Sequence, residues 1–143
     1  MLIKQISVFL ENRAGRLTEL TKVLATHNID IIAISIADTA DFGILRCIVD
    51  DPAKAEEVLR ANGFTASTTR VIAVELDDRP GGLSAVLEYL SEEGISIEYV
   101  YSFVRSKSDK ALILFKVNDP DEALAILGKH NVNTLCLADI VGK

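Results

Sequence analysis

Two short segments of the chain carry nearly the same residues in the same order, and their types suit the binding of a small anion. They are Asn12, Arg13, Ala14, Gly15, Arg16 and Leu17, and Asp78, Arg79, Pro80, Gly81, Gly82 and Leu83. In both, a strand-like apolar stretch precedes the glycine and a helical pattern follows it. A glycine turn that opens a helix points unpaired backbone N–H groups and the positive end of the helix dipole at one spot. Such a spot is suited to an anion.

The two segments belong to a longer internal repeat. The offset that carries Gly15 onto Gly81 also carries three alternating apolar residues onto three others, namely Ile6, Val8 and Leu10 onto Ile72, Val74 and Leu76. We therefore expect one unit written twice, as two domains of residues 1–69 and 70–143. A core of that size is near the lower limit for independent stability. The two halves are thus expected to support each other or to need a second chain.

In each copy the hydrophobic pattern predicts the order strand, helix, strand, strand, helix, strand. The predicted strands cover residues 6–10, 31–37, 44–49 and 64–69, then 71–76, 97–104, 111–117 and a last strand that holds Leu135 and Leu137. Polar turns are expected at 38–41 and 105–110, and no linker separates Thr69 from Val71. This order predicts an α+β fold of two βαββαβ ferredoxin-like units in tandem, with antiparallel sheets and both helices on one face.

Residue types at the helix ends support these boundaries. Asp51 and Asp119 each stand before a proline, which is the pattern of an N-cap followed by the first helical residue. Gly63 ends one of the helices, because glycine readily adopts the left-handed conformation of a helix C-cap. Asn131 takes the place of this glycine in the second copy.

The composition excludes several classes of function. The formal net charge of −6 and the lack of a Lys/Arg cluster argue against direct nucleic-acid binding. No secretory signal and no apolar run of membrane-spanning length is visible, so we expect a cytoplasmic protein without a membrane partner. Cys47 and Cys136 stand alone in apolar runs, which predicts buried reduced thiols and no metal site.

Catalytic residues are also missing from the pattern. The two histidines, His27 and His130, fall at predicted helix ends, and no Ser/His/Asp or Cys/His set is evident. Acylphosphatases share the βαββαβ topology, and Arg13 or Arg79 could supply their arginine. No asparagine lies in the middle of the second strands, however, to position a water molecule. We therefore expect no enzyme activity and no cofactor.

The second segment, continued by Gly94, Ile95, Ser96 and Ile97, resembles the ACT domain family of small regulatory modules that bind amino acids. The first copy departs from the family pattern at Ala14, where proline is common, and at Asn28, where glycine is common. The resemblance implies that two ACT units pair side by side with a free amino acid at their interface. Its ligand would be gripped by the glycine loop of one unit and by the start of the second strand of the other.

On this chain, the resemblance implies that both six-residue segments are the glycine loops that hold the ligand. It implies that Asp30 and Ser96, at the starts of the second strands, contact the ligand from the other unit. Loop amides would take the α-carboxylate, and Asp30 or loop carbonyls would take the ammonium group. The implied function is a regulatory protein that senses an amino acid and signals through a partner protein or enzyme. The small cores of the halves and the exposed strand edges of such sheets predict a homodimer. Two alternatives stay open: a dimerisation module that has lost its ligand, and a regulatory subunit of a separate enzyme of amino-acid metabolism.

Overall fold

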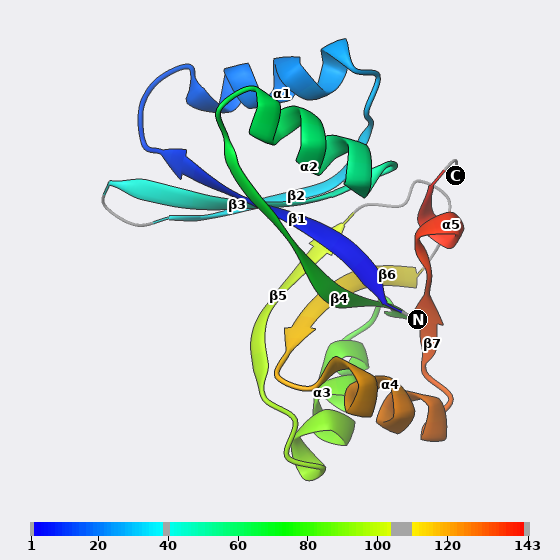
Figure 1. Ribbon diagram of the computed structural model, residues 1–143. Helices are drawn as coiled ribbons and strands as arrows, with labels where there is room; N and C mark the ends of the chain where they lie inside the picture. Colours follow the sequence, from blue (N-terminus) through cyan, green and yellow to red (C-terminus); the bar gives the residue numbers. More distant parts are fainter. Residues whose placement is uncertain (1, 39–40, 104–109, 142–143) are drawn as a thin grey trace. The chain divides into compact units, whose positions relative to one another are not determined.

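The computed structural model describes residues 2–38, 41–103 and 110–141, and the chain forms two compact units (Figure 1). One unit is Lys4–Thr69, and the other contains residues 70–141 together with Leu2 and Ile3. The turns predicted at 38–41 and 105–110 fall largely outside the described residues. No helix in the described part of the chain has the length and apolar character needed to cross a membrane.

The first unit is a complete βαββαβ module. Its elements are β1 (Ile3–Glu11), α1 (Arg16–Thr26), β2 (Ile31–Asp38), β3 (Phe42–Val49), α2 (Pro52–Ala61) and the first part of β4 (Thr65–Asp77). The strand order is β2-β3-β1-β4, with β3 antiparallel to both β1 and β2. Both helices cover the same face of this sheet (Figure 1). Their inward residues, among them Leu20, Leu24 and Leu59, bury the alternating residues Ile6 and Val8 of β1.

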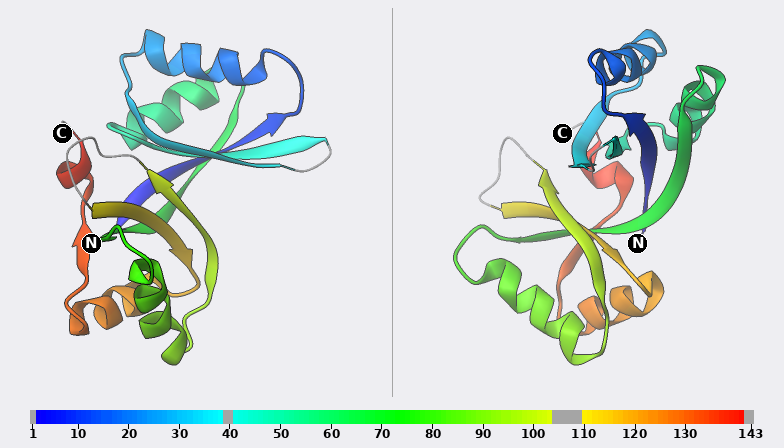
Figure 2. Two further views of the ribbon diagram at one scale, coloured as in Figure 1. Left: turned by 180° about the vertical axis from the view of Figure 1, so that it is seen from behind. Right: turned by 90° about the vertical axis from the view of Figure 1, so that its left-hand side faces the viewer.

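The second unit repeats this architecture. Its elements are the rest of β4, α3 (Gly82–Glu92), β5 (Ile97–Phe103), β6 (Lys110–Val117), α4 (Pro120–Lys129), β7 (Asn133–Leu135) and α5 (Leu137–Ile140). The strand order is β5-β6-β4-β7, the same as in the first unit. Figure 2 shows α3 and α4 on one face of this sheet. The register repeats as well, because Val8 lies opposite Leu45 and its counterpart Val74 lies opposite Ile113.

The predicted α+β fold of ferredoxin-like units is therefore confirmed, but the strands predicted at 64–69 and 71–76 are one continuous strand. β4 runs without a break from Thr65 to Asp77, so it closes the first unit and opens the second. The β-branched run around Thr68 and Thr69 favours extended backbone, and no glycine, proline or asparagine interrupts it. The two repeats are therefore joined without a linker and without a turn.

The predicted helix caps are present. The carboxylates of Asp51 and Asp119 accept hydrogen bonds from the amides of Lys54 and Glu122, each at 3.2 Å. Asn28 and Asn131 have φ angles of 58° and 56°, a left-handed conformation that asparagine tolerates better than most residues. At the ends of α1 and α4, asparagine thus adopts the left-handed conformation that glycine adopts at Gly63 after α2.

The C-terminal segment differs from the prediction. Leu137 was expected in the last strand but begins α5, because the Cys136 amide donates to Asp139 Oδ2 at 2.8 Å and caps this short helix. Cys136 is partly exposed rather than buried, since it lies at that cap. Cys47 is buried as predicted, and burial raises the pKa of its thiol to about 12. A thiol with that pKa stays protonated and unreactive at neutral pH.

Candidate functional site

The two glycine loops have the same geometry. Gly15 and Gly81 have φ angles of 87° and 88°, a left-handed conformation that favours glycine, and each precedes the first residue of a helix. Neither helix has a side-chain cap at this end. The helical hydrogen bonding begins with Glu19 N to Gly15 O at 2.9 Å in α1 and with Ala85 N to Gly81 O at 3.1 Å in α3.

This geometry leaves backbone donors for a ligand. Within the described residues, the amides of Leu17 and Thr18 have no protein acceptor, nor do those of Leu83 and Ser84. The first amides of a helix lie at the positive end of its dipole. Each loop therefore presents two donors in the position that the sequence predicted for an anion.

A cavity of about 210 Å³ opens beside the first loop, and we call it the first-loop cavity. It is lined by Leu10, Glu11, Asn12, Arg13, Leu17, Ile36 and Gly43. Of the predicted loop residues, the structure thus brings Asn12, Arg13 and Leu17 together here, whereas Ala14, Gly15 and Arg16 do not line it. The guanidinium of Arg13 lies 3.9 Å from Glu11 and 3.7 Å from Glu19.

Arg16 has other contacts. Its guanidinium lies 4.0 Å above the ring of Phe64 and bonds the carboxylates of Glu11 at 3.2 Å and Glu19 at 3.0 Å. Only 13% of its side chain is exposed, although each carboxylate is about half exposed. Arg16 therefore holds the loop against the end of α2 and the start of β4.

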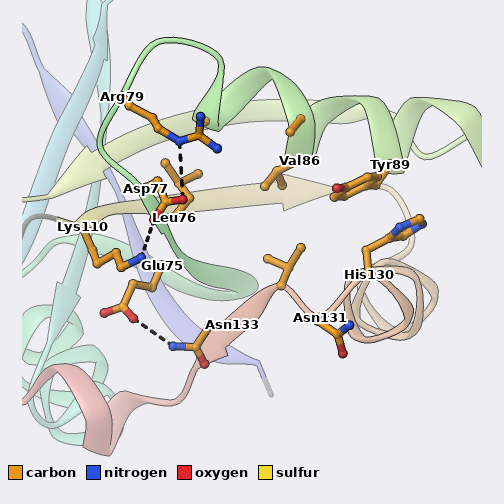
Figure 3. A pocket seen from close by; sticks show the side chains of 13 residues that line it. Glu75, Leu76, Asp77, Arg79, Val86, Tyr89, Lys110, His130, Asn131 and Asn133 are labelled. Carbon is orange, nitrogen blue, oxygen red and sulfur yellow. Dashed lines mark hydrogen bonds and ion pairs between the residues drawn. The ribbon is translucent and has the colours of Figure 1, made fainter.

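A larger cavity of about 320 Å³ lies in the second unit between α3 and β7 (Figure 3). We call it the α3–β7 cavity. It is lined by Glu75, Leu76, Asp77, Arg79, Gly82, Ala85, Val86, Tyr89, Lys110, His130, Asn131, Val132 and Asn133. Of the predicted residues of the second loop, Arg79 and Gly82 line it and Asp78, Pro80, Gly81 and Leu83 do not.

Charges gather at the loop end of the α3–β7 cavity. Asp77 accepts a hydrogen bond from Lys110, and its other oxygen lies 3.5 Å from Arg79 Nε. The Lys110 ammonium, and then Arg79, hold the pKa of Asp77 below its ordinary value of 3.8. In the first repeat the pKa of Glu11 is likewise lowered, by a backbone hydrogen bond and then by Arg16. Both carboxylates at the strand ends are therefore ionised at neutral pH.

The predicted facing residues have matching backbone surroundings. The Asp30 amide donates to Asp50 Oδ1, and the Ser96 amide donates to Asn118 Oδ1, each at 3.0 Å. In the opposite direction, the Asp50 amide donates to the Asp30 carbonyl and the Asn118 amide donates to the Ser96 carbonyl, each at 3.2 Å. Asp30 and Ser96 are exposed, and they line neither cavity. Their backbone is fixed, and their side chains face solvent in the single chain.

The sequence did not point to several residues of the α3–β7 cavity. Glu75 accepts a hydrogen bond from Asn133 Nδ2 at 3.0 Å, and the rings of Tyr89 and His130 stack 3.9 Å apart. Only Glu75 had a visible signal, as a charged residue inside an apolar strand. In the part of the chain that the structure describes, no cluster of three or more potential metal ligands is present.

With this geometry established, comparison with known proteins identifies the class. A family model described as an ACT domain pair matches residues 1–140, and the chain belongs to that family. A search among curated proteins gives no match. ACT domain pairs are regulatory modules, and no catalytic family is indicated.

Among solved structures, the chain is similar to protein BT0572 from Bacteroides thetaiotaomicron, with 43% identity over 100% of this chain and 98% of that one, at a TM-score of 0.93. It also shares the fold of the ligand-free regulatory subunit of aspartate kinase from Thermus thermophilus, with 16% identity over 90% of this chain and 93% of that one, at a TM-score of 0.65. A match to aspartate kinase from Synechocystis has 24% identity, a TM-score of 0.56, and covers 90% of this chain but 26% of the enzyme.

Proposed function

We propose that this protein is a regulatory protein that binds a free amino acid at its glycine loops and passes the signal to a partner protein or enzyme. The observation that supports it best is the pair of uncapped helix starts at Gly15 and Gly81, each with two amides that lack an acceptor in the part of the chain that the structure describes. Two converging amides and a helix dipole match an α-carboxylate.

The surroundings of the first loop supply the rest of an amino-acid site. The first-loop cavity has apolar walls from Leu10, Leu17 and Ile36, which suit an aliphatic side chain. Asp30 and Ser96, which are exposed in the single chain, are proposed to take the ammonium group across an interface between ACT units. Because a carboxylate makes a charge-assisted bond, the site that contains Asp30 would be the tighter one.

The proposal predicts a thermal shift with one or a few of the twenty amino acids. A ligand at one hundred times its Kd stabilises the folded state by about 2.7 kcal/mol. Gly15→Val is expected to abolish the shift from the first loop, and Gly81→Val that from the second, because a side chain at these positions strains the backbone and blocks the approach of a ligand.

Gly63→Val is the matched control. Gly63 has a φ of 84° at the end of α2 and lines neither cavity, so its substitution should lower the melting temperature and leave the ligand shift intact. If no amino acid shifts the melting temperature of the wild-type protein, or if both loop variants keep the full shift, the proposed binding site is wrong.

A second candidate function is dimerisation, and the two edge strands favour it. Ile34 of β2 is 44% exposed, and Val100, at the corresponding position of β5, is 43% exposed. Ile36, two residues further along β2, is 47% exposed. Exposed apolar residues on an unpaired strand edge favour pairing with another chain.

We therefore expect a homodimer in light scattering at micromolar concentration. Ile34→Lys combined with Val100→Lys should shift the protein toward the monomer, because the added charges would be buried in the contact. As a control, Ala25→Lys places a charge on an exposed position of α1 outside the glycine loop. A wild-type protein that is monomeric with and without amino acid would contradict this expectation.

A further inference from the structure

The α3–β7 cavity lies where the second repeat has smaller residues than the first repeat at two positions. In the repeat, Gly82 corresponds to Arg16 and Val132 corresponds to Phe64. Arg16 and Phe64 stack on each other at 4.0 Å and fill the space between α1 and the strand that follows α2. In the second repeat the equivalent space is open to the extent of about 320 Å³. The space beside the first helix is thus occupied by Arg16 and Phe64 in the first repeat, and it is an open cavity in the second.

The open space is not a packing defect, because it is lined by both polar and apolar groups in an ordered arrangement (Figure 3). Arg79 and Asp77 lie at the end nearest the loop, and Tyr89 and His130 lie at the opposite end. Apolar groups also line the cavity, namely Leu76, Ala85, Val86 and Val132. Such a mixture of apolar walls with a few placed polar groups is typical of small-molecule sites, as is a volume near 300 Å³.

The polar groups at the loop end can bind a ligand without breaking their own contacts. Within the described residues, the only side-chain contact of Arg79 runs through Nε to Asp77, so the two terminal nitrogens of its guanidinium have no protein partner there. This fork matches a carboxylate in two parallel hydrogen bonds. Asp77 and Glu75 add negative charge to the same region, and a carboxylate accepts several hydrogen bonds at once.

We propose that the α3–β7 cavity is a second amino-acid site, contained within one repeat and separate from the proposed glycine-loop site at the ACT–ACT interface, although Arg79 and Gly82 of the second loop line it. The ligand class is an α-amino acid with a large apolar or aromatic side chain. Its carboxylate binds the terminal nitrogens of Arg79, and its ammonium group binds Glu75 and Asp77. Its side chain lies between Val86 and Val132 and extends toward Tyr89.

The test is methyl NMR on the full chain with labelled valine, titrated with L-phenylalanine and L-leucine. We expect saturable shifts at Val86 and Val132, with intermolecular NOEs from the ligand side chain to both. Two partial probes separate the ends of the ligand: 3-phenylpropionate lacks the ammonium group and phenethylamine lacks the carboxylate. Each should bind at least about tenfold more weakly than L-phenylalanine, since a lost charge-assisted bond is worth more than 1.4 kcal/mol.

Variants make the assignment specific. Ala85→Leu fills the cavity with a residue that favours helix and should abolish the Val86 and Val132 shifts. Ser91→Leu makes the same kind of change on the exposed end of α3 and should leave them intact. Arg79→Gln should weaken binding of L-phenylalanine, and Arg79→Lys should restore part of it.

The proposal is overturned if neither amino acid shifts Val86 and Val132 in a saturable way at millimolar concentration, or if 3-phenylpropionate binds as tightly as L-phenylalanine. Persistence of the shifts in Ala85→Leu overturns it as well. Failure here is distinct from failure of the proposed function. Gly15→Val removes binding at the first loop and leaves the shift at Val132, because Gly15 does not line the α3–β7 cavity.

Discussion

Replacing Gly82 with alanine is expected to lower the free energy of unfolding by about 1–3 kcal/mol, the range for overpacking a fixed site. A Cβ at Gly82 would lie 2.3 Å from the carbonyl oxygen of Asp77, which is far inside contact distance. Leu76 Cδ1 would lie 3.5 Å from the same Cβ. Because the obstacle is backbone rather than the end of a flexible side chain, the turn itself has to move.

Gly128 offers a matched control in the same unit. It lies in α4 and a Cβ there would meet nothing within 4 Å, so Gly128→Ala should stabilise the protein by about 0.5–1 kcal/mol. Urea unfolding of both variants measures the contrast, and opposite signs are expected. A Gly82→Ala variant as stable as wild type would show that the turn can relax without loss.

Gly82→Ala also affects the α3–β7 cavity. Gly82 lines it, and its amide donates to Arg79 O at 3.0 Å, so a displaced turn moves Arg79. The first repeat shows how the same turn is built with a residue that has a Cβ. There Arg16 carries a Cβ, and the matching bond to Arg13 O is longer, at 3.3 Å. The tighter turn of the second repeat therefore depends on glycine at this position.

The sequence predicts most of the fold because the signals are local. Alternation along residues 71–76, helical spacing in α3 and the Asp-Pro pairs at Asp51 and Asp119 each depend on neighbouring residues. The internal repeat then supports the topology, because the same order of strands and helices is predicted in both copies. The continuous β4 was missed because a boundary between repeats suggests a break, whereas the backbone follows the β-branched residues at Thr68 and Thr69.

The cavities could not be predicted in the same way. The stacked pair of Tyr89 and His130 and the bond from Asn133 to Glu75 join residues far apart in the chain, so no spacing reveals them. The contact of Arg16 with Phe64 is equally distant in sequence. A sequence motif shows that Arg16 follows a glycine in the loop, but only the packing of the α2–β4 turn decides where its guanidinium lies.

The largest expected effect in the first repeat follows from that contact. Arg16→Ala should lower the free energy of unfolding by about 1–2 kcal/mol, because it removes a cation–π contact worth about 0.5–2 kcal/mol and uncovers a ring that is 4% exposed. The ion pairs with Glu11 and Glu19 add little, since both carboxylates are about half exposed and such pairs are weak. Urea unfolding measures the loss.

Arg16→Met separates packing from charge, because methionine keeps an apolar stem over the Phe64 ring and loses only the guanidinium. It should recover part of the stability that Arg16→Ala loses. Neither variant should change the thermal shift that an amino acid produces at the first loop, because Arg16 does not line the first-loop cavity. If the ligand shift disappears in both variants while Phe64 stays buried, Arg16 contacts the ligand directly, and its guanidinium must leave Glu11 and Glu19 when the ligand binds.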